Sequence, residues 1–154
     1  MNKTVHPLKA AVLDHCRTDT DRRIAHLTDA LAKVEAARDG ETKSSAGDKF
    51  ETGRAMMQLE AAKLRGQLAE AATVRDQLAA LSAAERPGPA AAGSMVATNR
   101  GNYYLAAGLG RVRLDGRVIY CTSLSSPVGR HLLGARTGDS FTFNELTFEV
   151  LGVV

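Results

Sequence analysis

The sequence contains no tryptophan, and only 5% of its 154 residues are aromatic. It also lacks any stretch of about 18 consecutive apolar residues, so it predicts no membrane-spanning helix. The first residues include a lysine but no sustained apolar segment, which argues against a secretory signal peptide. We therefore expect a cytosolic protein of one domain or two small domains.

Charge of one sign is not in large excess either. Twenty Lys and Arg residues against 17 Asp and Glu residues give a formal net charge of +3. Residues 1–92 carry 14 basic and 13 acidic residues, and residues 93–154 carry 6 and 4. Proteins that bind nucleic acid through phosphates need a larger basic excess on one surface. Charge alone therefore does not predict direct nucleic-acid binding.

Cysteine is scarce, with Cys16 and Cys121 far apart in the sequence. The two residues form no CxxC motif and no Cys/His spacing typical of zinc ligands. We therefore expect both thiols to be reduced in a reducing cytosol.

Good helix formers dominate the chain before residue 90. Pro7 is suited to a first helical turn, and Asp39-Gly40 is expected to end the first helix. Apolar residues at heptad spacing occur in two sets: Ile24, Leu27, Leu31 and Val34, then Phe50, Met57, Leu64, Ala71 and Leu78. Residues 1–82 are therefore predicted to form an antiparallel coiled-coil hairpin. Each arm would be about 50 Å long, and the tip would lie near residues 40–50.

The composition changes after the hairpin. Residues 83–93 contain two prolines and two glycines, which is typical of a linker. Residues 94–154 alternate β-branched or aromatic residues with polar ones, and Asp115-Gly116 lies between two strand-like segments, which predicts a β-hairpin. Pro127, the apolar residues that follow it and Gly134 predict one short helix. The fold class is therefore α+β, with a helical hairpin before a small antiparallel sheet crossed by one helix.

The segment SSPVGRHLLGARTGDSFTF, residues 125–143, resembles a pattern of the Gre transcript-cleavage factors of bacterial RNA polymerase. That pattern reads small residue, Pro, hydrophobic, Gly, Arg, any residue, Leu, Leu, Gly, basic, two residues, Gly, Asp. The closing LTFEVLGV is similar to the family's last strand. The resemblance implies an FKBP-like fold for residues 94–154, which would dock on the polymerase while the hairpin enters its secondary channel. The polymerase-docking residues that it implies are Pro127, Gly129, Arg130, Leu133 and Gly134.

Acidic residues crowd into the segment GETKSSAGDKFETGR, residues 40–54. Gre factors carry Gly–Asp–x–x–Glu at the hairpin tip, and Gly47 to Glu51 match this pattern. A rival register over residues 40–46 keeps Glu41 but has Ser44 where the second carboxylate belongs. We prefer the first register, because only it supplies two acids, Asp48 and Glu51.

The resemblance implies a role for these two acids at the polymerase active site. Magnesium is often held by one or two protein carboxylates, with water and phosphate oxygens as further ligands. Asp48 and Glu51 would share a magnesium ion with the polymerase and help it to hydrolyse backtracked RNA. One carboxylate would orient the attacking water. The protein would then be no enzyme by itself, but would complete the active site of its partner.

Other interpretations stay open. Ser45 to Asp48 is also a capping-box pattern, in which Asp48 satisfies amides at a helix start and Glu51 pairs with Arg54. Phe50 and the apolar residues after the tip also fit a regulator that occupies the same channel without cleaving RNA. A third hypothesis is a small adaptor whose hairpin self-associates. We expect a monomer.

Overall fold

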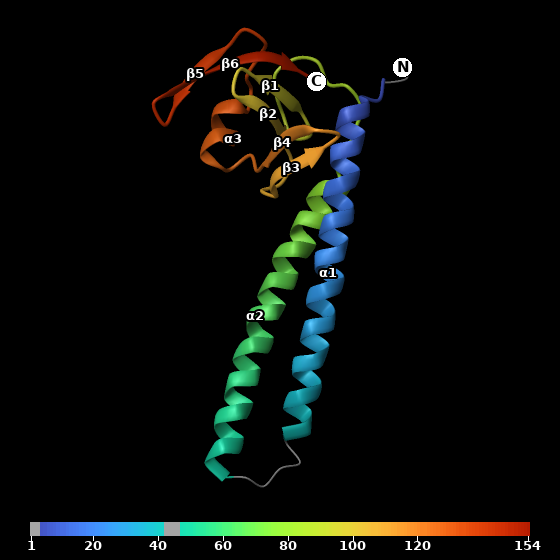
Figure 1. The fold of residues 1–154 in the computed structure, drawn as a ribbon, viewed down its shortest axis with the longest axis vertical. Coiled ribbons are helices and arrows are strands. Elements are labelled where there is room, and N and C mark those ends of the chain that lie inside the picture. Colours follow the sequence, from blue (N-terminus) through green and yellow to red (C-terminus); the bar gives the residue numbers. More distant parts are fainter. Residues whose placement is uncertain (1–3, 42–46) are drawn as a thin grey trace. The chain divides into compact units, whose positions relative to one another are not determined.

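The structure is a computed structural model that describes residues 4–41 and 47–154, with the side chains of 4–40 and 51–154. It has a long helical region followed by a six-stranded sheet with a short helix, which confirms the α+β class. The elements, labelled in Figure 1, are α1 (Pro7–Glu41), α2 (Gly47–Ala79), β1 (Met95–Thr98), β2 (Gly101–Leu105), β3 (Gly110–Leu114), β4 (Arg117–Thr122), α3 (Pro127–Leu132), β5 (Ser140–Phe143) and β6 (Leu146–Val153). None of the helices described is long and apolar enough to cross a membrane.

The chain divides into two compact units. The first unit consists of Met1–Arg17 and Gln77–Val154, and the second of Thr18–Asp76. The division cuts through both long helices, whereas the sequence predicted a linker at residues 83–93. That segment lies wholly within the first unit, where Ala84 forms a β-bridge with Val5 and Ala90 is buried. The base of the predicted hairpin therefore belongs to the same unit as the sheet.

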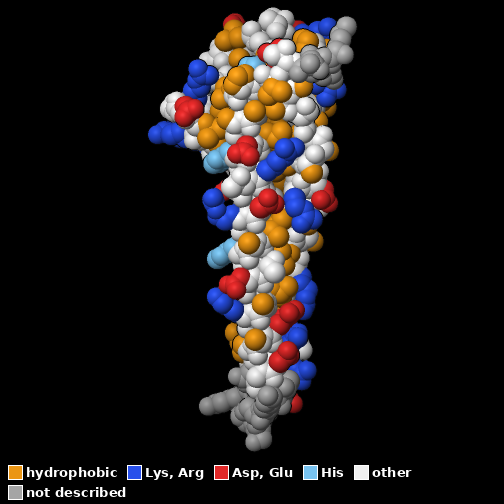
Figure 2. Space-filling model, turned by 90° about the vertical axis from the view of Figure 1, so that its right-hand side faces the viewer, with side chains coloured by type: hydrophobic (Ala, Val, Ile, Leu, Met, Phe, Trp, Pro, Cys, Tyr) orange, Lys and Arg blue, Asp and Glu red, His pale blue; other side chains and the backbone are white. Residues whose placement is uncertain are grey.

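The second unit is an antiparallel pair of helices (Figure 1). Leu27 of α1 and Leu64 and Ala71 of α2 are buried between them. The residues packed against this cluster are Ile24, Ala30, Leu31, Val34 and Leu68. The predicted heptad residues of α1 and, in α2, Leu64 and Ala71 therefore form the seam, whereas Met57 is not part of this cluster and the side chain of Phe50 lies outside the described residues. Acidic and basic side chains intermingle on the surface of the helical pair (Figure 2). Helix α1 is continuous through residues 17–23 and extends one residue beyond the predicted end at Gly40.

The sheet of the first unit has the strand order β3-β4-β2-β1-β6-β5. Four pairings are antiparallel, but β2 and β4 are parallel, with Tyr104 opposite Cys121. The sheet is therefore mixed, which corrects the prediction of an antiparallel one. The physical reason is which strand of the β3–β4 hairpin is buried. Strand β4 buries Ile119 and Cys121 and therefore takes the inner position beside β2. Strand β3 exposes Arg111 and Arg113 and lies at the edge of the sheet, where charged residues are suited.

The predicted turn at Asp115-Gly116 is confirmed. It is a two-residue loop between β3 and β4, with φ of 50° at Asp115 and 76° at Gly116. Positive φ at both positions matches the twist of the flanking strands, as in a type I′ turn. Asn144 and Glu145 form a second loop of this kind between β5 and β6, with φ of 49° and 64°.

Helix α3 covers one face of the sheet through Leu132, which is fully buried. The core cluster around it contains Ala90, Val96, Leu105, Ala135 and Val150. On the opposite face of the sheet, Tyr104 and Cys121 are buried, and Cys121 contacts Cys16 of α1 within the first unit. Strand alternation thus places two neighbouring residues of β2 in different buried layers, Leu105 on the α3 side and Tyr104 on the opposite side.

Candidate functional site

The segment around α3 begins with a capped helix. The Ser126 hydroxyl donates to the Ser123 carbonyl at 2.8 Å and accepts from the Gly129 amide at 3.0 Å. Pro127 follows in the first turn, where its missing N–H has no consequence. These contacts fix the start of α3 and confirm the short helix that the sequence predicts.

Two glycines of this segment are required for different reasons. A Cβ atom at Gly129 would lie 2.0 Å from the Ser123 carbonyl oxygen, so any larger residue would force the backbone apart. Gly134 has a φ of +81°, a conformation that favours glycine, and its amide donates to the Ala90 carbonyl at 2.7 Å. The Ala90 amide in turn donates to the Ala135 carbonyl at 2.8 Å. The turn after α3 is thereby tied to residue 90 by two backbone hydrogen bonds.

The predicted docking residues separate into two groups. Four of them are exposed, namely Pro127, Arg130, Leu133 and Gly134. Leu133 comes directly after the last residue of α3. Gly129 is buried. The close approach of the Ser123 carbonyl, which leaves no space for a Cβ atom, explains why glycine occurs at this position. The structure therefore brings four of the five residues to the surface of one short, rigidly held segment.

An aromatic stack beside α3 is a feature that the sequence analysis missed. The His131 ring stacks on Phe141 with centroids 4.9 Å apart, and Phe141 stacks on Phe148 at the same distance. The Arg100 guanidinium lies 5.7 Å from the centre of the Phe148 ring. These four residues come from α3, β5, β6 and the β1–β2 turn. The alternation of apolar and polar residues predicted that Phe141 and Phe148 lie in half-buried strands. It could not predict that His131 and Arg100 pack against their rings, because these residues come from other elements.

The predicted acidic residues lie around the α1–α2 connection. Position 41 ends α1, and position 48 follows the first residue of α2, but the side chains of Glu41 and Asp48 lie outside the described residues. Glu51 lies in the second turn of α2 and is exposed. In the described part of the chain, no ion pair joins Glu51 to Arg54. Residues 42–46, which include Ser45 of the alternative capping box, also lie outside the description.

No group of three or more His, Cys, Asp or Glu side chains within the described ranges could hold a metal ion. The side chains of Glu41 and Asp48 lie outside these ranges, so this finding does not extend to the predicted pair Asp48 and Glu51.

Comparison of the chain with protein-family models finds no model that matches it, and comparison with curated proteins finds no match. The functional argument therefore depends on the motifs of the sequence and the geometry of the two units.

Proposed function

We propose that this protein is a Gre-type transcription elongation factor that acts on bacterial RNA polymerase in the cytoplasm. In this proposal, residues 94–154 form an FKBP-like docking domain. The hairpin enters the secondary channel of the polymerase, where it stimulates cleavage of backtracked RNA. The protein acts as a monomer and contacts RNA only at the polymerase active site.

The observation that carries the proposal is the geometry of the segment around α3. Its resemblance to the Gre pattern includes positions that are explained by local structure, namely Gly129 and Gly134. It also includes Arg130 and Leu133, which are exposed and which no described contact explains. Arginine is enriched at protein–protein contact surfaces, and Leu133 adds exposed apolar surface to the same segment. Arg130 and Leu133 are thus the docking residues that mutagenesis should address first.

The helical pair supports the second half of the proposal. α1 has 35 residues and α2 has 33, and at 1.5 Å per residue each is about 50 Å long. Asp48 and Glu51 both belong to the first two turns of α2, next to the connection between the helices. Their carboxylates would join the polymerase's own ligands around a magnesium ion, which supplies charge stabilisation for phosphodiester hydrolysis. Glu51, being exposed, would accept a proton from the attacking water or orient it.

A second candidate function has an observation in its favour. Met56 and Leu59 of α2 are 68% and 74% exposed, close to the same end of the hairpin. Apolar side chains there suit packing against a partner rather than hydrolysis. A regulator that occupies the secondary channel and alters initiation or pausing, without cleaving RNA, would use this surface.

RNA cleavage in a backtracked elongation complex tests the proposal. The substitutions Asp48→Asn and Glu51→Gln remove charge with little change in shape, and Glu70→Gln, an exposed residue farther along α2, is the matched control. We expect the native protein and the control to shorten the RNA from its 3′ end, and both tip variants to lose most of this activity. Binding without cleavage by the native protein would favour the non-cleaving regulator.

Docking is tested separately by polymerase binding. We expect Arg130→Ala and Leu133→Ala to weaken binding of the full chain to the polymerase, with Arg113→Ala, an exposed arginine on β3, as the control. Equal binding by all three variants would contradict docking through α3. Sedimentation of the free protein addresses the adaptor hypothesis, because a stable dimer that buries the hairpin could not enter a narrow channel.

A further inference from the structure

A cavity of about 410 Å³ lies in the first compact unit, within the range of pockets that hold small molecules. Its walls come from the first turn of α1 and from residues 80–93. Leu81 and three alanines supply apolar surface, and Lys9, Glu85 and Arg86 supply charge. None of these residues belongs to the α3 segment or to the hairpin tip.

Lys9 is the unusual member of this lining. It is only 1% exposed, although lysine is almost never fully buried unless its charge is paired. Its ammonium group donates to the Ala84 carbonyl at 2.8 Å, and this is the only side-chain hydrogen bond of Lys9 in the described part of the chain. An ammonium group has three N–H donors. A carbonyl alone compensates poorly for the burial of a full positive charge.

Arg86 adds a second cation to the same wall. Its side chain is exposed, and its guanidinium donates to the Ala92 carbonyl at 3.4 Å, a long hydrogen bond that leaves most of its donors open to solvent or to a ligand. Burial, and next to it the charge of Arg86, lowers the pKa of Lys9, while Glu85 acts in the opposite direction. Neither Lys9 nor Arg86 forms an ion pair within the described ranges. The pocket therefore holds two cations against one carboxylate.

We propose that this pocket binds a small molecule through an oxyanion, a phosphate or carboxylate group held between Lys9 Nζ and the Arg86 guanidinium. Arginine presents paired donors that match the oxygens of either group, and lysine adds a compact charge. Glu85 limits the total negative charge of the ligand, which favours a monoester or monocarboxylate over a nucleoside triphosphate. The apolar wall around Leu81 accommodates the uncharged part of the ligand. This proposal does not depend on the function proposed above.

Binding is measured by calorimetry on the full-length protein, at constant ionic strength maintained with sodium chloride. The three probes are inorganic phosphate, phenyl phosphate and acetate. We expect saturable binding of at least one probe at one site per chain. A preference for the two phosphates over acetate identifies the ligand group as phosphate, and the reverse preference identifies it as carboxylate. Phenyl phosphate should bind more tightly than inorganic phosphate if the apolar wall contributes.

Three variants locate the site. Arg86→Gln should weaken binding at least about tenfold, because a hydrogen bond to a charged group contributes more than one power of ten in affinity. Lys9→Met, which keeps the length of the side chain, should abolish binding. Arg113→Gln is the matched control, an exposed arginine on β3 that should leave the affinity unchanged. If Lys9→Met fails to fold, Arg86→Gln decides the question by itself.

NMR of lysine labelled at its side-chain nitrogen gives a readout that depends only on this site. The pKa of Lys9 should rise when the probe saturates the pocket, because an anion stabilises the charged ammonium. The proposal is overturned if no probe binds saturably, if Arg113→Gln weakens binding as much as Arg86→Gln, or if saturation leaves the Lys9 pKa unchanged.

Discussion

The sulfur atoms of Cys16 in α1 and Cys121 in β4 lie 3.5 Å apart, and both side chains are buried in the first compact unit. This separation exceeds the roughly 2.05 Å of a disulfide bond, so the two meet as thiols. Their contact joins positions 105 residues apart in the sequence. The hydrogen bond to Cys16, together with burial, raises the pKa of Cys121 far above its ordinary value of 9.0. Cys121 is therefore protonated at neutral pH, and the two side chains are part of the buried core.

Tyr104 lies beside these thiols, and its buried hydroxyl has no hydrogen-bond partner among the described residues. Burial, followed by the two cysteines, raises the pKa of Tyr104 from 10.0 to about 12. Because the pKa of Tyr104 is higher in the folded state than in the unfolded state, ionisation of this hydroxyl destabilises the folded protein. The free energy of unfolding is unaffected by Tyr104 ionisation below pH 10. It falls by about 1.4 kcal/mol per pH unit as the pH rises from 10 toward 12.

We expect Tyr104→Phe to remove this part of the alkaline loss of stability. At pH 7 the variant should be as stable as the native protein or more stable, because the hydroxyl that it lacks is unsatisfied. Urea unfolding from pH 7 to 11 measures both effects, and the difference between the two proteins isolates Tyr104 from Cys121. Parallel curves at alkaline pH would contradict the prediction.

Two glycine substitutions should act in opposite directions. Gly129→Ala would place a Cβ atom 2.0 Å from the Ser123 carbonyl oxygen, and we expect a loss of about 3 kcal/mol or more. Gly66 lies inside α2 with no heavy atom within 4 Å of its added Cβ, so Gly66→Ala should stabilise the protein by about 0.5–1 kcal/mol. Chemical unfolding of both variants provides the comparison. A neutral Gly129→Ala would mean that the α3 turn can relax.

Arg17 binds the carbonyls at the end of α2. Its Nη2 atom donates to Leu78 O at 2.8 Å and to Leu81 O at 2.9 Å, and its Nε donates to Leu78 O at 3.2 Å. Cations are favourable at a helix C-terminus, and a guanidinium can bridge two carbonyls. Arg17→Lys keeps the charge but loses the bridge, so we expect a loss of about 1–2 kcal/mol. Arg22→Lys, at a side chain that is 74% exposed, is the control and should be nearly neutral in urea unfolding.

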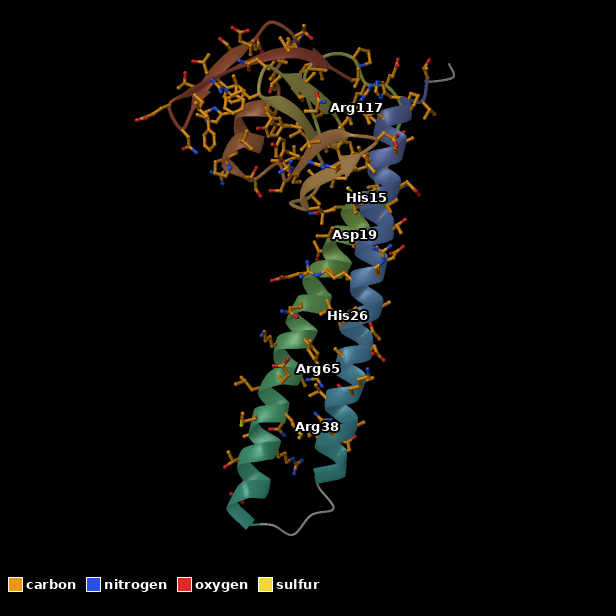
Figure 3. The ribbon with its side chains drawn as sticks, in the orientation of Figure 1. His15, Asp19, His26, Arg38, Arg65 and Arg117 are labelled. Carbon is orange, nitrogen blue, oxygen red and sulfur yellow. The ribbon has the colours of Figure 1, made fainter. Side chains whose placement is uncertain are left out.

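Arg65 of α2 reaches toward α1 (Figure 3), where its Nη2 atom is 2.6 Å from Glu35 Oε1. Both side chains are partly exposed, at 51% and 37%, so solvent screens their attraction. We expect a double-mutant cycle with Arg65→Gln and Glu35→Gln to give a coupling of about 0.2–1 kcal/mol. The coupling should shrink as salt is raised to about 1 M. A coupling well above this range, or one that salt does not change, would show that the pair is more strongly desolvated than its exposure indicates.

Local patterns in the sequence were sufficient to predict the helices and the hairpin at Asp115-Gly116. The heptad spacing of Leu27, Leu31 and Leu64 predicted the helical seam, and Asp115-Gly116 predicted a two-residue turn. Pro127 marked the start of α3. Each signal depends on residues within a few turns or strand repeats of one another, so the chain needs no distant partner to express it. The acidic tip stays a prediction, because the side chain of Asp48 lies outside the described residues.

The sequence by itself thus determined the two long helices, the turn at Asp115-Gly116 and the short helix after Pro127. Only the tertiary structure decided that β4 pairs with β2 in parallel, that Cys16 meets Cys121, and that Lys9 is buried beside Arg86. Periodicity shows which side of an element is apolar, but not which other element will cover it. That choice depends on the packing and burial of the whole unit, in which segments distant in the sequence compete for the same surface.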